Sequence, residues 1–155
     1  MTLDRIISGG QTGAARAALD FDITHAVPLG GWCPKGRRAE DGAIPERYAL
    51  QETPSREYNQ RTERNVRDWD ATAIFTMRAT LTGVSKLSAE FATKHGKPWL
   101  HLARAAGSDP ARRLREFLDP HAVKVLNAAG SRASKEPEVA AFTTAVLAVV
   151  LGGLT

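Results

Sequence analysis

The sequence predicts an α/β domain of the Rossmann-like, doubly wound type, with a mostly parallel sheet of about five strands flanked by helices. Short apolar runs alternate with helical patterns along the chain, and glycine-containing turns follow several of the runs. The runs are almost continuously apolar, which is typical of strands covered on both faces. The chain has 155 residues and neither a repeat nor a linker, so we expect one domain over residues 1–155.

The N-terminal half begins with an apolar strand at residues 3–8, which an alanine-rich helical pattern follows at residues 12–25. Residues 28–45 form a long Gly/Pro-rich loop, and such loops in compact domains are usually functional or disordered. A further strand of the sheet is expected at residues 49–53, before a polar helix over residues 55–68.

The C-terminal half continues the alternation. A buried strand is expected at residues 71–77, a helix at residues 82–95 and another strand at residues 98–103, and Gly96 is placed to end the helix. Asp109 and Pro110 form an N-cap with proline at the first helical position, which predicts a helix to about residue 118. A last strand at residues 122–127 precedes an apolar closing helix marked by Val139, Phe142, Val146 and Val149.

Composition and charge limit the function classes. The net charge of +4 and the pI of about 9.6 favour a small anionic ligand and are too mild to favour nucleic acid. No apolar run spans a bilayer and no signal pattern begins the chain, so we expect a cytoplasmic protein without membrane partners. The single cysteine, Cys33, is expected to pack in the core, and the four histidines show no metal-ligand spacing.

Three donor-rich turns follow predicted strands, where doubly wound proteins bind their ligands. The first turn contains Gly9, Gly10, Gln11, Thr12 and Gly13, and it matches neither G-x-G-x-x-G nor the P-loop. The second turn offers Thr82, Gly83, Ser85 and Lys86, and the third offers Gly130, Ser131, Arg132 and Ser134. The first turn alone is explained equally well by a tight strand–helix connection without a ligand, and Ser134 in the third turn is also explained as a helix cap. Together, at helix starts, they favour an anion site.

The long loop supplies further candidates. Trp32 can stack on a planar ring, and Lys35 and Arg37, on either side of Gly36, can pair with an anion. Glu90 lies in the second turn of the helix after Thr82, so it faces either the same crevice or solvent. For Glu90 taken by itself, a surface carboxylate is the simpler interpretation.

Four blocks make the chain resemble the molybdenum cofactor carrier protein family: "IISGGQTG", "GGWCPKGRRAEDG", "KHGKPWLHL" and "AGSRASKEP". The resemblance covers nearly the whole chain. It implies a Rossmann-like oligomer, often a tetramer, that binds, stores and protects molybdenum cofactor without catalysis. That cofactor is a pterin with a dithiolene, a terminal phosphate and an oxomolybdenum group. Molybdoenzymes or cofactor-biosynthesis proteins are the implied partners.

The expected cofactor site comprises the three turns, Glu90 and the 32–37 segment. Glycine turns and helix starts suit the phosphate or the oxomolybdenum group, the basic side chains suit its charge, and Trp32 covers the pterin. Two positions depart from the family pattern, because Ala15 replaces a carboxylate and Val84 replaces a glycine.

A second, more distant resemblance is to lysine decarboxylase-like phosphoribohydrolases. The chain has, in the same order as these enzymes, an arginine on a polar helix, a strand, and a glycine turn followed by a glutamate. These features are Arg61, residues 70–75, Gly83 and Glu90. This resemblance implies an enzyme that cleaves the N-glycosidic bond of a nucleoside 5′-monophosphate, with Arg61 on the sugar phosphate and Glu90 at the reacting centre. A sensor that binds a nucleotide-derived ligand through the same residues is the third hypothesis.

Overall fold

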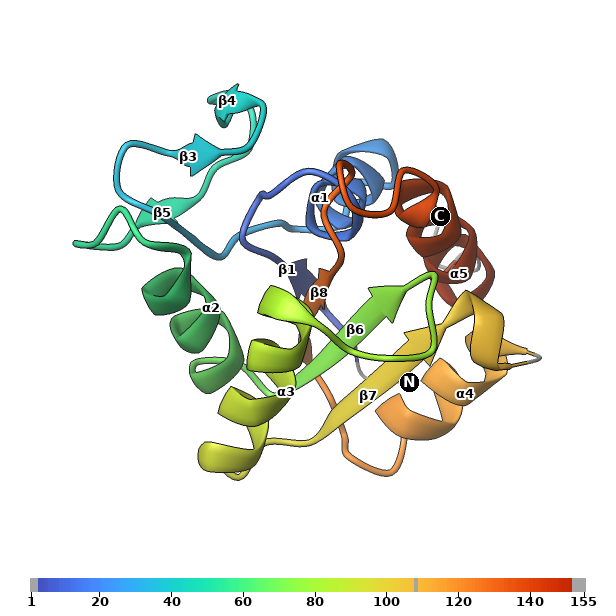
Figure 1. The fold of residues 1–155 in the computed structure, drawn as a ribbon. Helices are drawn as coiled ribbons and strands as arrows, with labels where there is room; N and C mark the ends of the chain where they lie inside the picture. The colour runs from blue at the N-terminus through green and yellow to red at the C-terminus, as the bar shows by residue number, and fades with distance from the viewer. Residues whose placement is uncertain (1–2, 108, 152–155) are drawn as a thin grey trace.

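A parallel four-stranded sheet lies between two layers of helices in the computed structural model, which describes residues 3–107 and 109–151 (Figure 1). The strand order is β1-β8-β6-β7 and every neighbouring pair is parallel. The strands are β1 (Arg5–Ile7), β6 (Ala71–Thr76), β7 (Trp99–Ala103) and β8 (Val125–Gly130). The α/β, doubly wound prediction is confirmed, with four strands in the sheet in place of about five. Residues 1–2 and 152–155 of the expected domain lie outside the described range.

Within the described residues, five α-helices cover the sheet: α1 (Ala14–Thr24), α2 (Tyr58–Arg67), α3 (Gly83–Lys94), α4 (Pro110–Leu118) and α5 (Val139–Leu151). A short 3-10 helix, η1, covers Arg104–Ala106. Helices α1, α4 and α5 pack together on one face, and α2 and α3 pack together on the other (Figure 1). All six residues of β6 are buried, as expected for a strand between two helical layers.

The predicted strand at residues 49–53 is wrong as a member of this sheet. Only Gln51–Glu52 (β5) is extended, and it pairs in parallel with Trp32–Cys33 (β2) in a separate two-stranded sheet. Both residues of β5 are exposed, so this short polar segment has no apolar face with which to enter the central sheet. The hairpin β3 (Arg38–Ala39) and β4 (Gly42–Ala43) lies in the same loop region.

Other boundaries shift by a few residues for local reasons. The last strand begins at Val125 because the preceding residues form a turn, in which Ala122 has a positive φ of 49°. Helix α1 begins after Gly13, whose φ of 85° is outside the helical range. Two predicted helix signals are confirmed: the Asp109 side chain accepts the backbone N–H of Arg112, and Gly96 has a φ of 64° just after α3.

The long loop has its own small core, so it is ordered. Leu19 of α1 packs with Cys33, Ala39, Ile44 and Tyr48, all of which are buried. Burial raises the pKa of the Cys33 thiol, which keeps it protonated and unreactive at neutral pH. Cys33 is therefore a packing residue, as predicted. None of the helices in the described part of the chain is long and apolar enough to cross a membrane.

Asp22 is a fully buried carboxyl on α1, and neither of its oxygens has a hydrogen-bond partner. Burial raises its pKa to about 9, and the nearby Arg5 offsets only part of this effect. The folded protein therefore keeps Asp22 protonated at neutral pH, whereas the unfolded chain ionises it near pH 4, roughly its reference pKa. Because the unfolded state binds fewer protons over that interval, the free energy of unfolding falls as the pH rises from about 4 to about 9.

We therefore expect Asp22→Asn to stabilise the protein, and to do so more at higher pH. The gain over wild type grows by at most about 1.4 kcal/mol per pH unit between these limits. Urea denaturation at about pH 5, 6.5 and 8 measures it. Glu138→Gln, at an exposed position, is the control and should show no such trend. A gain for Asp22→Asn that does not change with pH would contradict the raised pKa.

Candidate functional site

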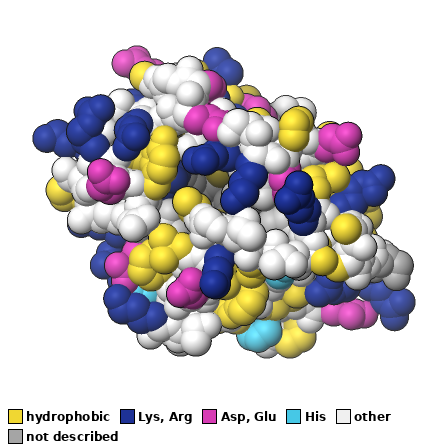
Figure 2. All heavy atoms as spheres, viewed as in Figure 1, with side chains coloured by type: hydrophobic (Ala, Val, Ile, Leu, Met, Phe, Trp, Pro, Cys, Tyr) yellow, Lys and Arg dark blue, Asp and Glu magenta, His cyan; other side chains and the backbone are white. Residues whose placement is uncertain are grey.

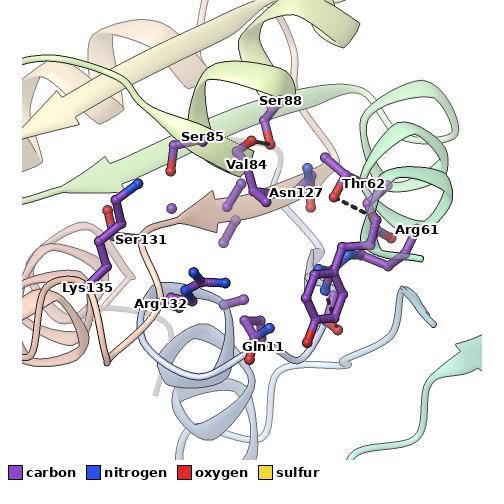
Figure 3. A pocket seen from close by; sticks show the side chains of 18 of the residues that line it. Gln11, Arg61, Thr62, Val84, Ser85, Ser88, Asn127, Ser131, Arg132 and Lys135 are labelled. Atoms are coloured by element: carbon purple, nitrogen blue, oxygen red, sulfur yellow. Dashed lines mark hydrogen bonds between the residues drawn. The ribbon is translucent and has the colours of Figure 1, made fainter. Parts of the chain in front are cut away.

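A cavity of about 150 Å³ lies at the carboxyl edge of the sheet. Its walls come from the turn before α1, the inner face of α2, the start of α3, and β8 with the turn that follows it. Figure 3 shows Arg61 on one side of this cavity and Arg132 and Lys135 on the other. The site is therefore where doubly wound sheets bind their ligands, outside the carboxyl ends of the strands.

The side chains that line the cavity carry positive charge only. Arg61, Arg132 and Lys135 contribute three cations, and none of the described lining residues is Asp or Glu. Figure 2, in the orientation of Figure 1, shows several Lys and Arg side chains near the middle of the visible face of the molecule. Clefts lined by one sign of charge concentrate ligands of the opposite sign, so the cavity favours an anion.

Arg61 is the most buried of these cations, with 5 % of its surface exposed. Its Nη1 donates to the carbonyl of Gly9 at 2.9 Å, the guanidinium lies 5.3 Å from the ring centre of Tyr58, and its Nε has no hydrogen-bond partner. Burial lowers the pKa of Arg61 to about 10, which leaves it charged at neutral pH. A Cβ at position 9 would lie 2.3 Å from Arg61 Nη1, so glycine is needed there for the cation to reach the turn.

The three predicted turns meet around the cavity. The backbone N–H of Ala14 donates to the Ser131 carbonyl at 3.1 Å, and a Cβ at Gly13 would lie 2.3 Å from that oxygen. The first and third turns are therefore in direct backbone contact. The second turn faces them across the cavity, where a Cβ at Gly83 would lie 3.1 Å from Lys135 Nζ.

Comparison with known proteins identifies the relatives of this chain. Residues 6–151 match the family described as "Circularly permutated YpsA SLOG family". The chain belongs to this SLOG family. A crystal structure at 48 % identity, with a TM-score of 0.94, covers 97 % of this chain and 96 % of its own. It is described as a "Putative molybdenum carrier protein" from Syntrophus aciditrophicus SB, which confirms the resemblance predicted from the sequence blocks. No curated protein matches the chain.

Eight of the predicted site residues lie on the cavity wall of this protein: Gly9, Gln11, Thr82, Gly83, Ser85, Gly130, Ser131 and Arg132. Arg61 lies there too. Four others, Gly10, Thr12, Gly13 and Ser134, belong to the same turns without lining the cavity. The two positions that depart from the family pattern, Ala15 and Val84, also line it. The positive φ in the second turn falls on Gly83, at 56°, and not on Val84.

Helix α3 turns two predicted residues away from the cavity. Lys86 and Glu90 are exposed and do not line it, because they lie four residues apart on the outer face of the helix. The inner face of α3 is formed by Ser85, Ser88 and Ala89, which are buried. The Glu90 carboxylate therefore does not lie in the cavity, although the site predicted from the sequence included it.

The 32–37 segment does not line the cavity either, and several of its polar groups are bonded to α2 and its C-cap or within the loop. The indole N–H of Trp32 donates to the Asp68 carboxylate at 2.9 Å, and Arg64 lies over its ring. Arg37 donates to the carbonyls of Ile44, Pro45, Tyr48 and Leu50. Lys35 is exposed, and the Gly36 N–H donates to Glu52 at 2.7 Å. A long loop needs partners for its backbone carbonyls, and Arg37 meets that need.

Eight lining residues were not predicted from the sequence. Six have polar side chains, namely Tyr58, Thr62, Asn65, Ser88, Asn127 and Lys135, and the other two are Ala128 and Ala129 of β8. Two signals in the sequence point to some of them. Thr62 and Asn65 accompany Arg61 on the buried side of a polar helix, where apolar residues are usual. Asn127 interrupts an apolar strand. It donates to Thr72 at 3.2 Å, and its buried amide oxygen has no partner.

Proposed function

We propose that this protein is a non-catalytic carrier of molybdenum cofactor, which it binds through the cavity at the carboxyl edge of the sheet. The observation that carries the proposal is the charge of that cavity, three cations without a carboxylate among its described lining residues. A phosphorylated pterin with an oxomolybdenum group is an anion of matching sign. The 48 % identical relative described as a molybdenum carrier supports this choice of ligand.

The size of the cavity limits how such a ligand is held. About 150 Å³ accommodates roughly one benzene-sized group, so one end of the cofactor enters and the rest lies along the rim. Arg61 Nε is a buried donor without a partner, and the first N–H groups of α3 lack partners within the helix. These donors suit phosphate or oxomolybdenum oxygens, so the residues present fit one anionic end of the cofactor.

The same geometry favours a carrier over the phosphoribohydrolase alternative. That enzyme would need Glu90 beside the glycosidic bond, and the Glu90 side chain is exposed on the outer face of α3. No Asp, Glu, His or Cys is found among the described residues that line the cavity, so no lining side chain can take the role that the alternative gives to Glu90. A carrier needs binding and shielding of the ligand only.

Purification without oxygen tests the carrier proposal. Mass spectrometry and metal analysis of the protein should find molybdenum together with a pterin phosphate, or apo protein should bind added cofactor. Protein that contains none and also ignores added cofactor would overturn the proposal. Incubation with AMP tests the alternative, since released adenine would establish the enzyme and intact AMP that binds would favour the nucleotide sensor.

Lys135→Gln should weaken binding of the cofactor about tenfold, because it removes one of the two rim cations. Isothermal titration at low and physiological salt measures the loss, and the wild-type affinity should fall more steeply with salt than that of the variant. Lys124→Gln, at an exposed position outside the cavity, is the control. Equal losses for both variants would indicate a general charge effect in place of a site.

A carrier also needs recipients, and we propose molybdoenzymes or cofactor-biosynthesis proteins in that role. We further propose a homo-oligomer. Two features support it: Trp99 is 38 % exposed, and β7, the strand that contains it, is an edge of the sheet. Size-exclusion chromatography with light scattering should show a mass above that of one 16.7 kDa chain.

A further inference from the structure

Beside the cavity, a carboxylate of the protein itself occupies a set of anion donors. Glu40 stands at the tip of the β3–β4 hairpin and reaches the turns before α1 and after β8. Its carboxylate accepts from the Thr12 hydroxyl, from the Ser134 N–H at 3.1 Å and from the Ser134 hydroxyl at 2.5 Å. Arg132 Nε lies 3.5 Å from the same carboxylate. We call these donors of Thr12, Arg132 and Ser134 the Glu40 cradle.

The composition of the Glu40 cradle is that of a phosphate site. A backbone N–H, two hydroxyl groups and a guanidinium converge on one pair of oxygens, and each is a common partner of phosphate. The backbone N–H of Ala133 donates to Thr12 Oγ1 at 3.1 Å, which orients the Thr12 hydroxyl toward the carboxylate. All three cradle residues belong to turns that the sequence predicts to bind an anion.

The Glu40 cradle adjoins the cavity. Arg132 belongs to both, and the side-chain oxygen of Gln11, a cavity residue, accepts the backbone N–H of Glu40 at 2.9 Å. A ligand too large for the cavity would therefore meet Glu40 where it leaves the cavity at this wall. The Glu40 side chain is 22 % exposed, so it is partly open to solvent.

We propose that Glu40 is an internal stand-in for a phosphate monoester, and that the terminal phosphate of the bound ligand displaces it from Thr12, Arg132 and Ser134 and releases the hairpin tip. The proposal rests on the proposed function for the identity of the ligand and on the contacts above for the location of its phosphate. A phosphate dianion brings more charge and more acceptor oxygens than one carboxylate, so the cradle favours it once the rest of the ligand is anchored in the cavity.

Titration with inorganic phosphate tests the cradle without the cofactor. Glu40→Ala empties the cradle and should bind inorganic phosphate about tenfold more tightly than wild type, and Glu40→Gln should change affinity in the same direction by less. Asp41→Asn is the matched control. Asp41 is the adjacent residue of the hairpin tip and forms an ion pair with Arg16 at 3.0 Å, so the variant removes one charge and loosens the tip without emptying the cradle.

Phosphate affinity that is unchanged or weaker in Glu40→Ala would overturn the proposal, and so would a gain in Asp41→Asn equal to that in Glu40→Ala. Thermal unfolding of each variant confirms that it is folded. Trypsin then reports on release, because Arg37 immediately precedes the hairpin and Arg38 lies in β3. Cleavage at these arginines should be faster in Glu40→Ala and in wild type saturated with cofactor. Protection of the wild-type hairpin by cofactor would also overturn the proposal.

These outcomes separate the two proposals. If Glu40→Ala gains phosphate affinity while no variant binds molybdenum cofactor, the Glu40 cradle stands and the carrier function fails. If the cofactor binds wild type and Glu40→Ala equally well and phosphate affinity does not change, the carrier function stands and the Glu40 inference fails.

Discussion

Arg61→Met should weaken binding of an anionic ligand about 100-fold while leaving the protein folded. The variant removes a charged donor whose Nε is free inside the cavity, and loss of such a bond to a charged ligand costs about 3 kcal/mol at the upper end of its range. Isothermal titration with the cofactor, and with AMP as the competing ligand class, measures the loss. Arg61→Lys should recover only part of the affinity, since an ammonium lacks the planar fork of the guanidinium.

The fold should tolerate Arg61→Met because a buried charge contributes little net stability. Burial already lowers the pKa of Arg61 to about 10, which reflects the cost of removing the guanidinium from water. We expect the midpoint of thermal unfolding to stay level or to rise. Arg64→Met, on the same helix, removes a guanidinium that lies over Trp32 outside the cavity, and it should leave affinity unchanged. Similar losses for Arg61→Met and Arg64→Met would contradict the placement of the site.

Gly13→Ala should destabilise the protein by about 3 kcal/mol or more. A Cβ at position 13 would lie 2.3 Å from the Ser131 carbonyl oxygen and 2.8 Å from the Ala133 nitrogen, and the φ of 85° disfavours any side chain. Backbone atoms on the far side of the contact cannot rotate away as a side chain would. The two turns must therefore separate, which also opens the candidate site.

Gly42→Ala is the matched control for this prediction. Gly42 has a φ of 112°, and a Cβ there would meet no atom within 4 Å, so only the conformational cost of about 1 kcal/mol is expected. Urea denaturation of both variants separates the free-energy cost of the steric clash from the cost of placing a side chain at a positive φ. If Gly13→Ala costs no more than Gly42→Ala, the contact between the two turns is not as tight as the structure indicates.

Much of the fold follows from local patterns that the sequence contains. The alternation of apolar runs and helical stretches predicted the doubly wound class, and Asp109 and Gly96 marked real helix boundaries because caps depend on the few residues around them. The prediction that residues 49–53 join the central sheet was wrong because a short extended segment does not specify the strand with which it pairs. Gln51–Glu52 pairs with Trp32–Cys33, and both residues of β5 are exposed.

For the site, the sequence determined by itself that three donor-rich turns would meet, since the carboxyl ends of parallel strands share one edge. Only the tertiary structure decided which charges face the cavity. Arg61 enters it while Arg37 is used by loop carbonyls, and Glu40 bonds to Ser134 although 94 residues separate them. Many Lys, Arg, Asp and Glu side chains in the sequence are chemically able to make such contacts. The selection among them depends on distance in the folded chain and on which polar groups lack another partner when buried, and neither is encoded in local spacing.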